Sequence, residues 1–312
     1  MTPVDTAVIG VGHQGRWHAD KFAALDEARL VAVADADEAR CNAVAADLGV
    51  EAVTDYHDLI GRVAAVSIAT PTPSHFDIAT TLLDAGVHVL IEKPLASTIE
   101  QARQMVELAE ARGVILQVGH LERFNPVVMA MAPHVSHPEF IESIRVAPFQ
   151  PRGTDVSVVL DLMIHDIDLI HSFTRSRMSH LDAVGRAVFT DHLDIANARI
   201  EFESGCVANV TSSRISLKKE RSLRIFQPHA YISADLLAKH STMYRKRDDQ
   251  EVISPEDLEI HRMEAGPSDA LLHQARAFLD SVSGGAAPLV TGRVALQALE
   301  TAINIAERID LR

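Results

Sequence analysis

The sequence predicts an α/β protein, with a doubly wound parallel sheet first and an α+β domain with a largely antiparallel, open sheet second. Short apolar runs alternate with helical patterns as far as about Gly119, as a parallel sheet requires. After about Leu121 consecutive strand-like runs replace this alternation. The chain has 312 residues, about twice the usual length of one domain. We therefore expect two domains, residues 1–121 and 122–312.

Five apolar runs of the first domain have the length and composition of buried strands. We expect these strands at Thr6–Ile9, Leu30–Ala34, Ala65–Ala69, Val87–Ile91 and Val114–Val118. The helices between them should end at Gly49, Gly86 and Gly113, where glycine permits a left-handed cap. The stretch Ser97-Thr98-Ile99-Glu100 has the spacing of a capping box. A helix is therefore expected directly after Glu92-Lys93-Pro94.

The second domain combines one apolar helix with several strands. The helix is expected at about Val156–Phe173, and strand-like runs occupy 181–190, 195–203, 206–213 and 221–227. Glu203-Ser204-Gly205 should form the turn between the middle pair of strands. Residues 268–283 and 291–309 have helical periodicity, with glycine and proline between them.

Charge and cysteine content argue against several classes of protein. The net charge of −14 opposes general binding to nucleic acid or to anionic membranes. Cys41 and Cys206 lie far apart without C-x-x-C spacing, so neither a disulfide framework nor a cysteine zinc site is expected. The first residues lack a basic segment, and no apolar run approaches the roughly 18 to 20 residues that span a bilayer. We expect a cytoplasmic protein.

A glycine-rich loop opens the first helix. Gly10-Val11-Gly12-His13-Gln14-Gly15 follows a predicted strand, and Asp35 ends the next strand 20 residues beyond Gly15. Glycines at this point permit a tight turn and close approach of the backbone to a pyrophosphate. A carboxylate at Asp35 accepts hydrogen bonds from ribose hydroxyls and repels a 2′-phosphate unless an arginine compensates. The pattern predicts a Rossmann domain that binds NAD, and Arg40 leaves some tolerance of NADP open.

Two motifs carry the candidate chemistry, and Glu92-Lys93-Pro94 is the first. It leaves a parallel strand at its carboxyl end, where open α/β sheets bind ligands. A lysine there can reach a substrate hydroxyl near the nicotinamide. Taken alone, Lys93 would more simply be a surface cation, but its position relative to the glycine loop favours the functional interpretation.

The second motif lies in the apolar helix. At about 100° per residue, Asp161, His165 and Asp168 share one stripe, and Asp166 lies about 140° away from Asp161. An imidazole flanked by carboxylates can act as a general base while hydride leaves the substrate. A hydrogen-bonded core histidine and a metal site are the alternatives. No metal is predicted, because hydride transfer to NAD needs none.

With these motifs the chain resembles the Gfo/Idh/MocA oxidoreductase family over essentially its whole length. The resemblance implies a nicotinamide that faces a sugar or cyclitol, and an open sheet that forms a homodimer or homotetramer interface. It also implies Lys93, Asp161 and His165 as catalytic residues. We expect His165 to be the base, Asp161 its partner and Lys93 the donor to the developing alkoxide, although Lys93 and His165 could exchange roles. Further residues assigned to the cofactor site are Thr70, Pro71, His75 and Glu92.

Residues 119–126 and 160–168 resemble the branch of this family that oxidises the 3-hydroxyl of UDP-N-acetylglucosamine on the route to lipid A amino sugars. Met163 departs from the family, whose members commonly have a small residue there. The segment Arg214–Arg224 contains five cations, and we expect a pyrophosphate to be bound there or by Arg123 and Arg152. The expected substrate contacts are Lys93, Arg123, Asn125, Arg152, Asp161, His165 and Arg214.

Alternatives remain for both the segment and the substrate. The cations of Arg214–Arg224 could simply be solvated on one strand face. An inositol, an aldose or a UDP-sugar uronate would suit the same enzyme class. A sugar-sensing regulator without catalysis is the alternative of another class, since a fold does not fix a function.

Overall fold

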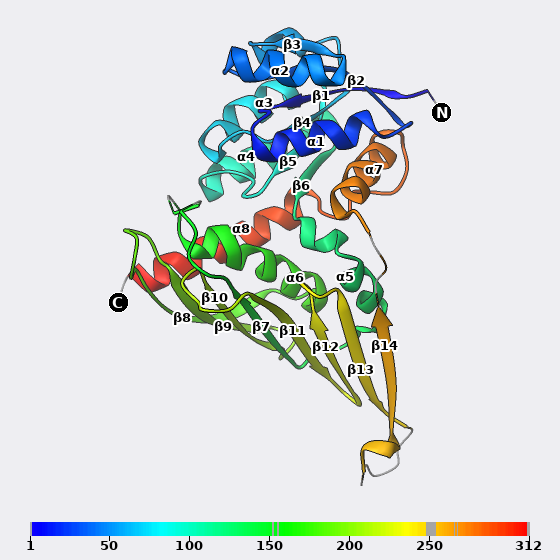
Figure 1. Ribbon diagram of the computed structural model, residues 1–312. Helices are drawn as coiled ribbons and strands as arrows, with labels where there is room; N and C mark the ends of the chain where they lie inside the picture. The colour runs from blue at the N-terminus through cyan, green and yellow to red at the C-terminus, as the bar shows by residue number, and fades with distance from the viewer. Residues whose placement is uncertain are drawn as a thin grey trace. The chain divides into compact units, whose positions relative to one another are not determined.

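The computed structural model describes residues 2–151, 153–154, 156–247, 254–264, 266 and 268–310 (Figure 1). The chain forms two compact units. The first comprises Met1–Leu121 and Asp269–Leu296, and the second comprises Glu122–Ser268 and Gln297–Arg312. Within the described residues, no helix combines the length and the apolar character needed to cross a membrane.

The first unit is built on a six-stranded parallel sheet in the order β3-β2-β1-β4-β5-β6. Its strands are β1 Val4–Ile9, β2 Ala28–Ala34, β3 Glu51–Val53, β4 Ala65–Ile68, β5 His88–Glu92 and β6 Leu116–Gly119. All five strands that the sequence predicts are present, and β3 is an addition at the edge. The strand order changes direction between β1 and β4, which is the point where open α/β sheets bind ligands.

Helices connect these strands, as the sequence predicts. They are α1 His13–Ala23, α2 Glu38–Leu48, α3 His75–Asp84 and α4 Ile99–Arg112. Gly49 and Gly113 end α2 and α4 with φ of +67° and +65°. The start of α4 corrects the expectation of a cap at Ser97, because the side chain of Thr98 accepts the hydrogen bond from the amide of Gln101.

Residues 269–296 belong to the first unit, which differs from the expected single division at residue 121. They include α7, Ala270–Val282, an amphipathic helix that packs on α1. The rings of Phe22 and Phe278 meet edge to face with centroids 6.5 Å apart, and both side chains are fully buried. The packing of these two buried rings stabilises the association of residues 269–296 with the core of the first unit.

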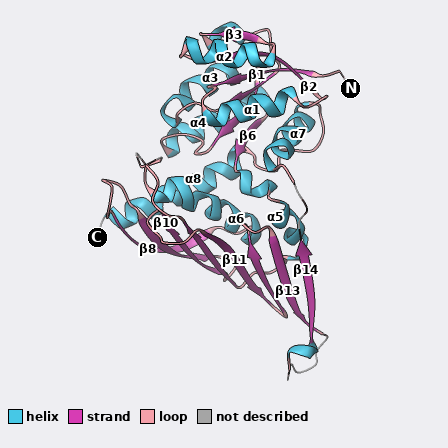
Figure 2. Cartoon of the chain, in the orientation of Figure 1, coloured by secondary structure: helices cyan, strands magenta, loops and turns pink. Residues whose placement is uncertain are grey.

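The second unit is built on an eight-stranded sheet in the order β14-β13-β12-β11-β7-β10-β9-β8 (Figure 2). Every neighbouring pair is antiparallel except β7 and β10, so the predicted largely antiparallel sheet is confirmed. The strands are β7 Phe140–Val146, β8 Met178–Arg186, β9 Ile195–Phe202, β10 Val207–Ser213, β11 Glu220–Gln227, β12 Ala230–Asp235, β13 His240–Lys246 and β14 Leu258–Glu264. The sequence predicts β8 to β11, with β8 placed too late, and misses the other four.

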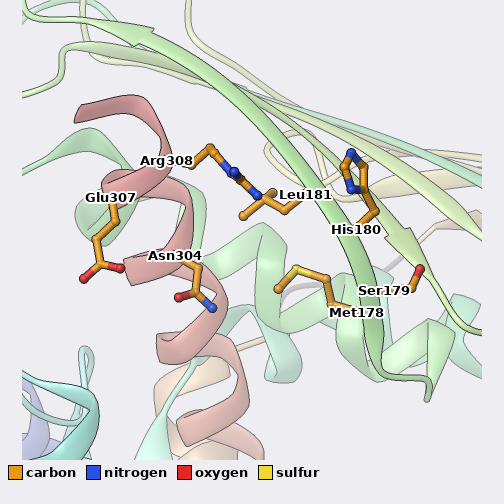
Figure 3. Close-up of a pocket in the computed structure, with 7 residues that line it drawn as sticks. All are labelled: Met178, Ser179, His180, Leu181, Asn304, Glu307 and Arg308. Carbon is orange, nitrogen blue, oxygen red and sulfur yellow. The ribbon is translucent and has the colours of Figure 1, made fainter. Parts of the chain in front are cut away.

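Helices cover one face of this sheet, and α5 Pro126–Met131 and α6 Ile164–Thr174 contact its strands. Burial alternates along β8 and β9, so the opposite face is open. The last helix, α8, spans Gly292–Asp310. Figure 3 shows a surface pocket lined by Met178, Ser179, His180 and Leu181 of β8 and by Asn304, Glu307 and Arg308 of α8. No residue that the sequence assigns to a site lines this pocket.

The apolar segment before Phe173 is not a uniform α-helix. Val159–Met163 form a π-helical turn, and α6 begins only at Ile164. The rotation of about 100° per residue that we applied to Asp161 is therefore wrong for this turn. Turns of π-helix are rare in proteins overall, and those that occur are often found at functional sites.

Candidate active site

The glycine loop is tight at two positions and open at one. Gly10 has a φ of +80°, and a Cβ atom there would lie 2.6 Å from Thr70. A Cβ atom at Gly15 would lie 1.7 Å from the carbonyl oxygen of Gly10, so only glycine fits. At Gly12, by contrast, a Cβ atom would meet nothing within 4 Å. The loop thus leaves room for a ligand at the start of α1, where backbone N–H groups and the helix dipole favour an anion.

Asp35 lies at the end of β2, directly beside this loop. Its carboxylate accepts hydrogen bonds from the amides of Val11 at 2.8 Å and Asp37 at 2.9 Å. Arg40 adds two more, at 3.0 and 2.7 Å. Burial alone would raise the pKa of Asp35, but these hydrogen bonds, led by those from Arg40, hold it below its ordinary value. The group is therefore an ionised acceptor at neutral pH.

These residues fit a dinucleotide. Gly12 provides open space at the helix start, and Asp35 provides the acceptor that adenosine ribose hydroxyls require. The side-chain oxygen of Gln14 is buried and has no hydrogen-bond partner among the described residues, which suits a donor supplied by a ligand. His13 is exposed and packs against Trp17, with ring centroids 4.2 Å apart and ring planes tilted by 55°.

A buried hydrogen-bonded chain supports the turn that contains Lys93. Ser67 of β4 contacts Nδ1 of His18 at 2.8 Å, and Nε2 of His18 contacts Glu92 at 2.9 Å. The other carboxylate oxygen of Glu92 accepts the amide of Lys93 at 3.3 Å. Lys93 itself is half-buried and joined to Pro94 by a cis peptide bond. Sequence reasoning missed His18 and Ser67, although His18 lies on the apolar face of the predicted helix.

His75 supports the same turn from the other side. It is fully buried, and its two ring nitrogens lie 2.9 Å from the carbonyl of Thr70 and 3.0 Å from that of Pro94. Burial lowers its pKa, although both carbonyl contacts oppose that effect. His75 therefore braces the loop after β4 against Pro94, whereas Pro71 in the same loop is exposed.

The candidate residues of the second unit lie on the π turn and on α6. Asp161 belongs to the π turn and His165 to the first turn of α6, and both are half-buried. The carboxylate of Asp166 instead accepts two hydrogen bonds from the buried guanidinium of Arg145, at 2.6 and 3.1 Å. Asp168 is fully buried and lies 3.9 Å from Arg123. Arg123, expected to contact substrate, thus also balances a buried carboxylate.

Arg145 is the centre of a buried charged cluster. Besides Asp166 it donates to Glu122 at 2.9 Å, and Glu122 accepts a further hydrogen bond from Arg221. Burial alone would raise the pKa of Glu122, but the two arginines hold it below its ordinary value. Asn125 also donates to Glu122 and caps α5, so its side chain supports the fold at this place.

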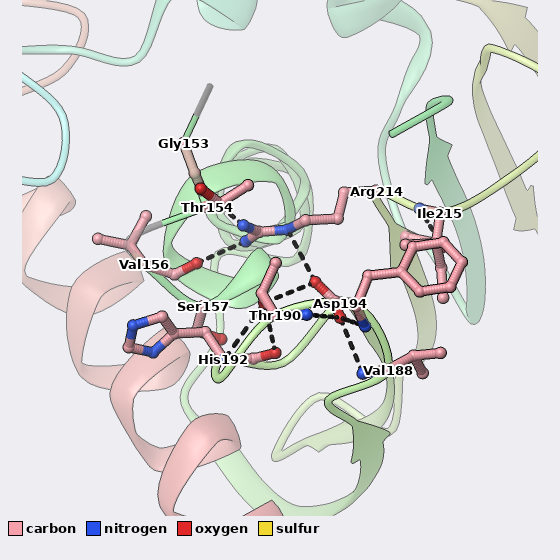
Figure 4. A network of polar contacts seen from close by, with 12 residues as sticks. Gly153, Thr154, Val156, Ser157, Val188, Thr190, His192, Asp194, Arg214 and Ile215 are labelled. Carbon is pink, nitrogen blue, oxygen red and sulfur yellow. Dashed lines mark hydrogen bonds and ion pairs between the residues drawn. The ribbon is translucent and has the colours of Figure 1, made fainter. Parts of the chain in front are cut away.

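Arg214 and Asp194 order the segment beside Asp161 (Figure 4). The guanidinium of Arg214 is almost fully buried and donates to the carbonyl oxygens of Gly153 and Val156. Gly153 lies so close to Asp161 that a Cβ atom there would be 3.1 Å from its carboxylate. Arg214, which we expected to bind a pyrophosphate, therefore uses its hydrogen bonds within the protein.

Asp194 in turn fixes the loop after β8. Its carboxylate accepts the amides of Val188, Phe189 and Thr190 at 2.6 to 3.0 Å, and it lies 3.9 Å from Arg214. Burial opposes ionisation, but these hydrogen bonds outweigh it and lower the pKa of Asp194 to about 2. The loop replaces the end of the strand that the sequence predicts at 181–190.

The remaining cations of the Arg214–Arg224 segment do not form one basic patch. Lys218 pairs with Glu220, Arg221 with Glu122 and Arg224 with Glu142. Arg152 lies outside the described residues. Among those that are described, no three His, Cys, Asp or Glu side chains are arranged to hold a metal ion.

Comparisons with known proteins identify a family over most of the chain. The model of the Gfo/Idh/MocA oxidoreductase family with an NAD-binding Rossmann fold matches residues 4–120, and the model of the Gfo/Idh/MocA C-terminal domain matches residues 144–232. UDP-N-acetylglucosamine 3-dehydrogenase of Acidithiobacillus ferrooxidans is 35% identical over 98% of this chain and 97% of its own. Its solved structure has a TM-score of 0.93 and covers 100% of this chain and 99% of its own at 34% identity.

More distant relatives act on cyclitols. Myo-inositol 2-dehydrogenase of Thermotoga maritima is 25% identical over 94% of this chain and 92% of its own. The structure of scyllo-inositol dehydrogenase from Lactobacillus casei covers 99% of this chain and 98% of its own, with a TM-score of 0.82 and 21% identity. At that identity the likeness concerns the fold.

Proposed function

Since the chain belongs to the Gfo/Idh/MocA oxidoreductase family, we propose that it oxidises the 3-hydroxyl of UDP-N-acetylglucosamine with NAD. The observation that carries this proposal is the end-to-end similarity to the A. ferrooxidans enzyme, at 35% identity over 98% of the chain. Myo-inositol 2-dehydrogenase, at 25% identity, supports the same chemistry less strongly for a cyclitol. The product would be the UDP-3-keto sugar, made in the cytoplasm for the amino sugars of lipid A.

Each candidate residue has a role in this proposal. NAD, held by the glycine loop and Asp35, would accept the hydride. His165 is the base that takes the hydroxyl proton, and Asp161 orients its imidazole. The ammonium of Lys93 donates a hydrogen bond to the oxygen on which negative charge develops. The exchange of roles between Lys93 and His165 is the alternative.

A substrate panel tests the reaction directly. NADH formation is followed with UDP-N-acetylglucosamine, its uronate and myo-inositol, and kcat/KM should be highest for UDP-N-acetylglucosamine. A higher value for myo-inositol would assign the chain to the cyclitol enzymes instead. Absence of turnover with every compound, in protein that binds NAD, would reject the dehydrogenase proposal.

Variants test the assigned roles. His165→Ala should lower kcat by about 10²-fold or more while the Kd of NAD stays unchanged, because acid–base residues contribute on that scale. His137→Ala is the matched control, since that histidine is exposed on a loop of the same unit. Lys93→Ala should cause a similar loss. A His165→Ala enzyme as active as the His137→Ala enzyme would exclude His165 as the base.

We also propose a homodimer or homotetramer formed through the open face of the second sheet. A row of aromatic rings crosses four of its strands, with Phe140, Phe226, Tyr231 and Tyr244 at centroid distances of 5.7, 4.7 and 5.8 Å. Phe226 is 38% exposed and the other three rings are half-buried, and partly exposed aromatic rows of this kind are typical of interfaces. Tyr231→Lys should lower the mass measured by light scattering, and an unchanged oligomeric mass would argue against this face.

A further inference from the structure

Three side chains from separate elements of the first unit form one buried hydrogen-bonded chain. Ser67 lies on β4, His18 on α1 and Glu92 at the end of β5. Ser67 is fully buried, and the exposed fractions of His18 and of the Glu92 side chain are 2% and 14%. Polar groups so deep in a core are costly unless their hydrogen bonds are satisfied, and here both contacts of His18 are shorter than 3 Å.

The direction of the hydrogen bond between His18 and Glu92 follows from the charge of Glu92. Burial would raise the pKa of Glu92, but the hydrogen bond and charge interaction with His18 and the nearby charge of Lys93 lower it. The ionised carboxylate can only accept, so Nε2 of His18 carries a proton and donates to Glu92. On the other side of the ring, the hydroxyl of Ser67 lies 2.8 Å from Nδ1. The ring is thus oriented from both sides.

Glu92 passes this constraint to the turn that follows. One carboxylate oxygen is bound by His18, and the other accepts the backbone amide of Lys93 at 3.3 Å. Gly119, at the end of the neighbouring strand, leaves the space that the carboxylate occupies, since a Cβ atom there would lie 2.9 Å from it. The carboxylate therefore has one position, and the backbone of Lys93 is fixed by it.

We propose that His18 is a positioning residue that holds the backbone of Lys93 through Glu92. The inference rests on the proposed catalytic role of Lys93. His18 lies on α1, whose first turn follows the glycine loop, so one helix both opens the cofactor site and fixes the catalytic turn. A displacement of a reacting group by about 1 Å can lower a rate by about 10²-fold, which makes such a support matter for catalysis.

A double-mutant cycle tests this chain of contacts. His18→Phe fills the space without hydrogen bonds, and Glu92→Gln keeps the shape but removes the charge. Each single variant should lower kcat by at least about 10-fold, with KM for the substrate and Kd for NAD changed far less. Because both act through one contact, the double variant should lose no more than the worse single variant. Losses that multiply would overturn the proposal.

Two further variants separate positioning from a loss of structure. His18→Gln keeps an amide N–H and should recover part of kcat relative to His18→Phe, which a purely structural role would not predict. His88→Phe is the control, because His88 lies at the opposite end of β5 and its side chain bonds only the amide of Ile115 among the described contacts. It should retain wild-type kcat. If His18→Phe does not fold, His18→Leu, which also makes no hydrogen bond, replaces it in the cycle under the same criterion.

The outcomes also distinguish this inference from the proposed function. A wild-type enzyme without turnover on the substrate panel, or a fully active Lys93→Ala variant, contradicts the proposed function. An active wild type with an inactive Lys93→Ala variant, combined with unaffected kcat in His18→Phe, contradicts the role of His18 alone.

Discussion

Replacing Asp35 by serine is expected to reverse the preference between NAD and NADP. An ionised carboxylate that accepts two ribose hydroxyls contributes about 1.5 kcal/mol for each bond, or about 3 kcal/mol in all. Its loss should raise the Kd of NAD by about 150-fold. For NADP, a carboxylate about 4 Å from a phosphate charge is repelled by about 4 kcal/mol at an effective dielectric constant of 20. Removing that repulsion also releases Arg40, now bonded twice to Asp35, toward the 2′-phosphate.

Titration calorimetry with both cofactors measures these changes. NADP should bind Asp35→Ser at least about 10²-fold more tightly than the wild type, and the second substitution Arg40→Ala should remove part of that gain. Glu38→Gln is the control, because Glu38 is exposed at the start of α2 and glutamine keeps its shape. An unchanged affinity for NADP in Asp35→Ser would refute the assignment of this carboxylate, and a gain that survives Arg40→Ala would refute the role of Arg40.

Three predictions concern stability, each measured as the free energy of unfolding in urea. Burial lowers the pKa of His171 to about 4. Between about pH 6.5 and pH 4 the unfolded chain therefore binds a proton at this histidine that the native state does not bind. The free energy of unfolding should fall by about 3 kcal/mol over this range. His171→Gln should lack this part of the pH dependence, and an identical slope would contradict it. Arg145→Met should cost about 3 to 5 kcal/mol, because it leaves the buried carboxylate of Asp166 without its guanidinium and removes one of the two arginines bound to Glu122, and a loss below about 1 kcal/mol would show that water reaches Asp166. If the two units unfold in separate transitions, NAD should stabilise the transition of the first unit, and Phe278→Ala should lower the free energy of that transition by about 3 to 5 kcal/mol. A loss confined to the transition of the second unit would show that α7 does not belong to the first unit.

The first unit follows closely from the sequence because its strands are buried on both faces. Their apolar runs and the glycines after the helices are local signals, and each acts within a few residues. The edge strand β3 was missed because three residues give too short a pattern. The membership of α7 was missed for another reason, since nothing near Phe278 in the sequence indicates that it packs on Phe22.

The second unit was predicted less completely because buried polar and charged residues occupy inward positions of its sheet. In β7 the inward position of Arg145 breaks the alternation of apolar and polar residues that identifies a strand. Its compensation by Asp166 and Glu122 comes from segments distant in sequence. In β13 the inward position of Ser241 has a similar effect, because a buried serine interrupts the apolar face of the strand.

The candidate site shows the same division between local and distant information. The glycine loop, Asp35, the Glu92-Lys93 turn and the Asp161–His165 segment were all identified by local motifs. The π turn around Asp161 has no such motif, and the partners that support each motif, among them His18 and Arg214, become visible only in three dimensions. A local motif can indicate candidate catalytic residues, whereas the side chains that position those residues come from distant parts of the sequence and are identified only from the fold.

The close approach between Gly119 and the carboxylate of Glu92 restricts how this protein can vary during evolution. A methyl group at position 119 would lie 2.9 Å from that carboxylate, so alanine there would displace the end of the Glu92 side chain. The two positions are paired on adjacent strands, so a change at either one alters the space available to the other. Selection is therefore expected to act on the two positions as a pair.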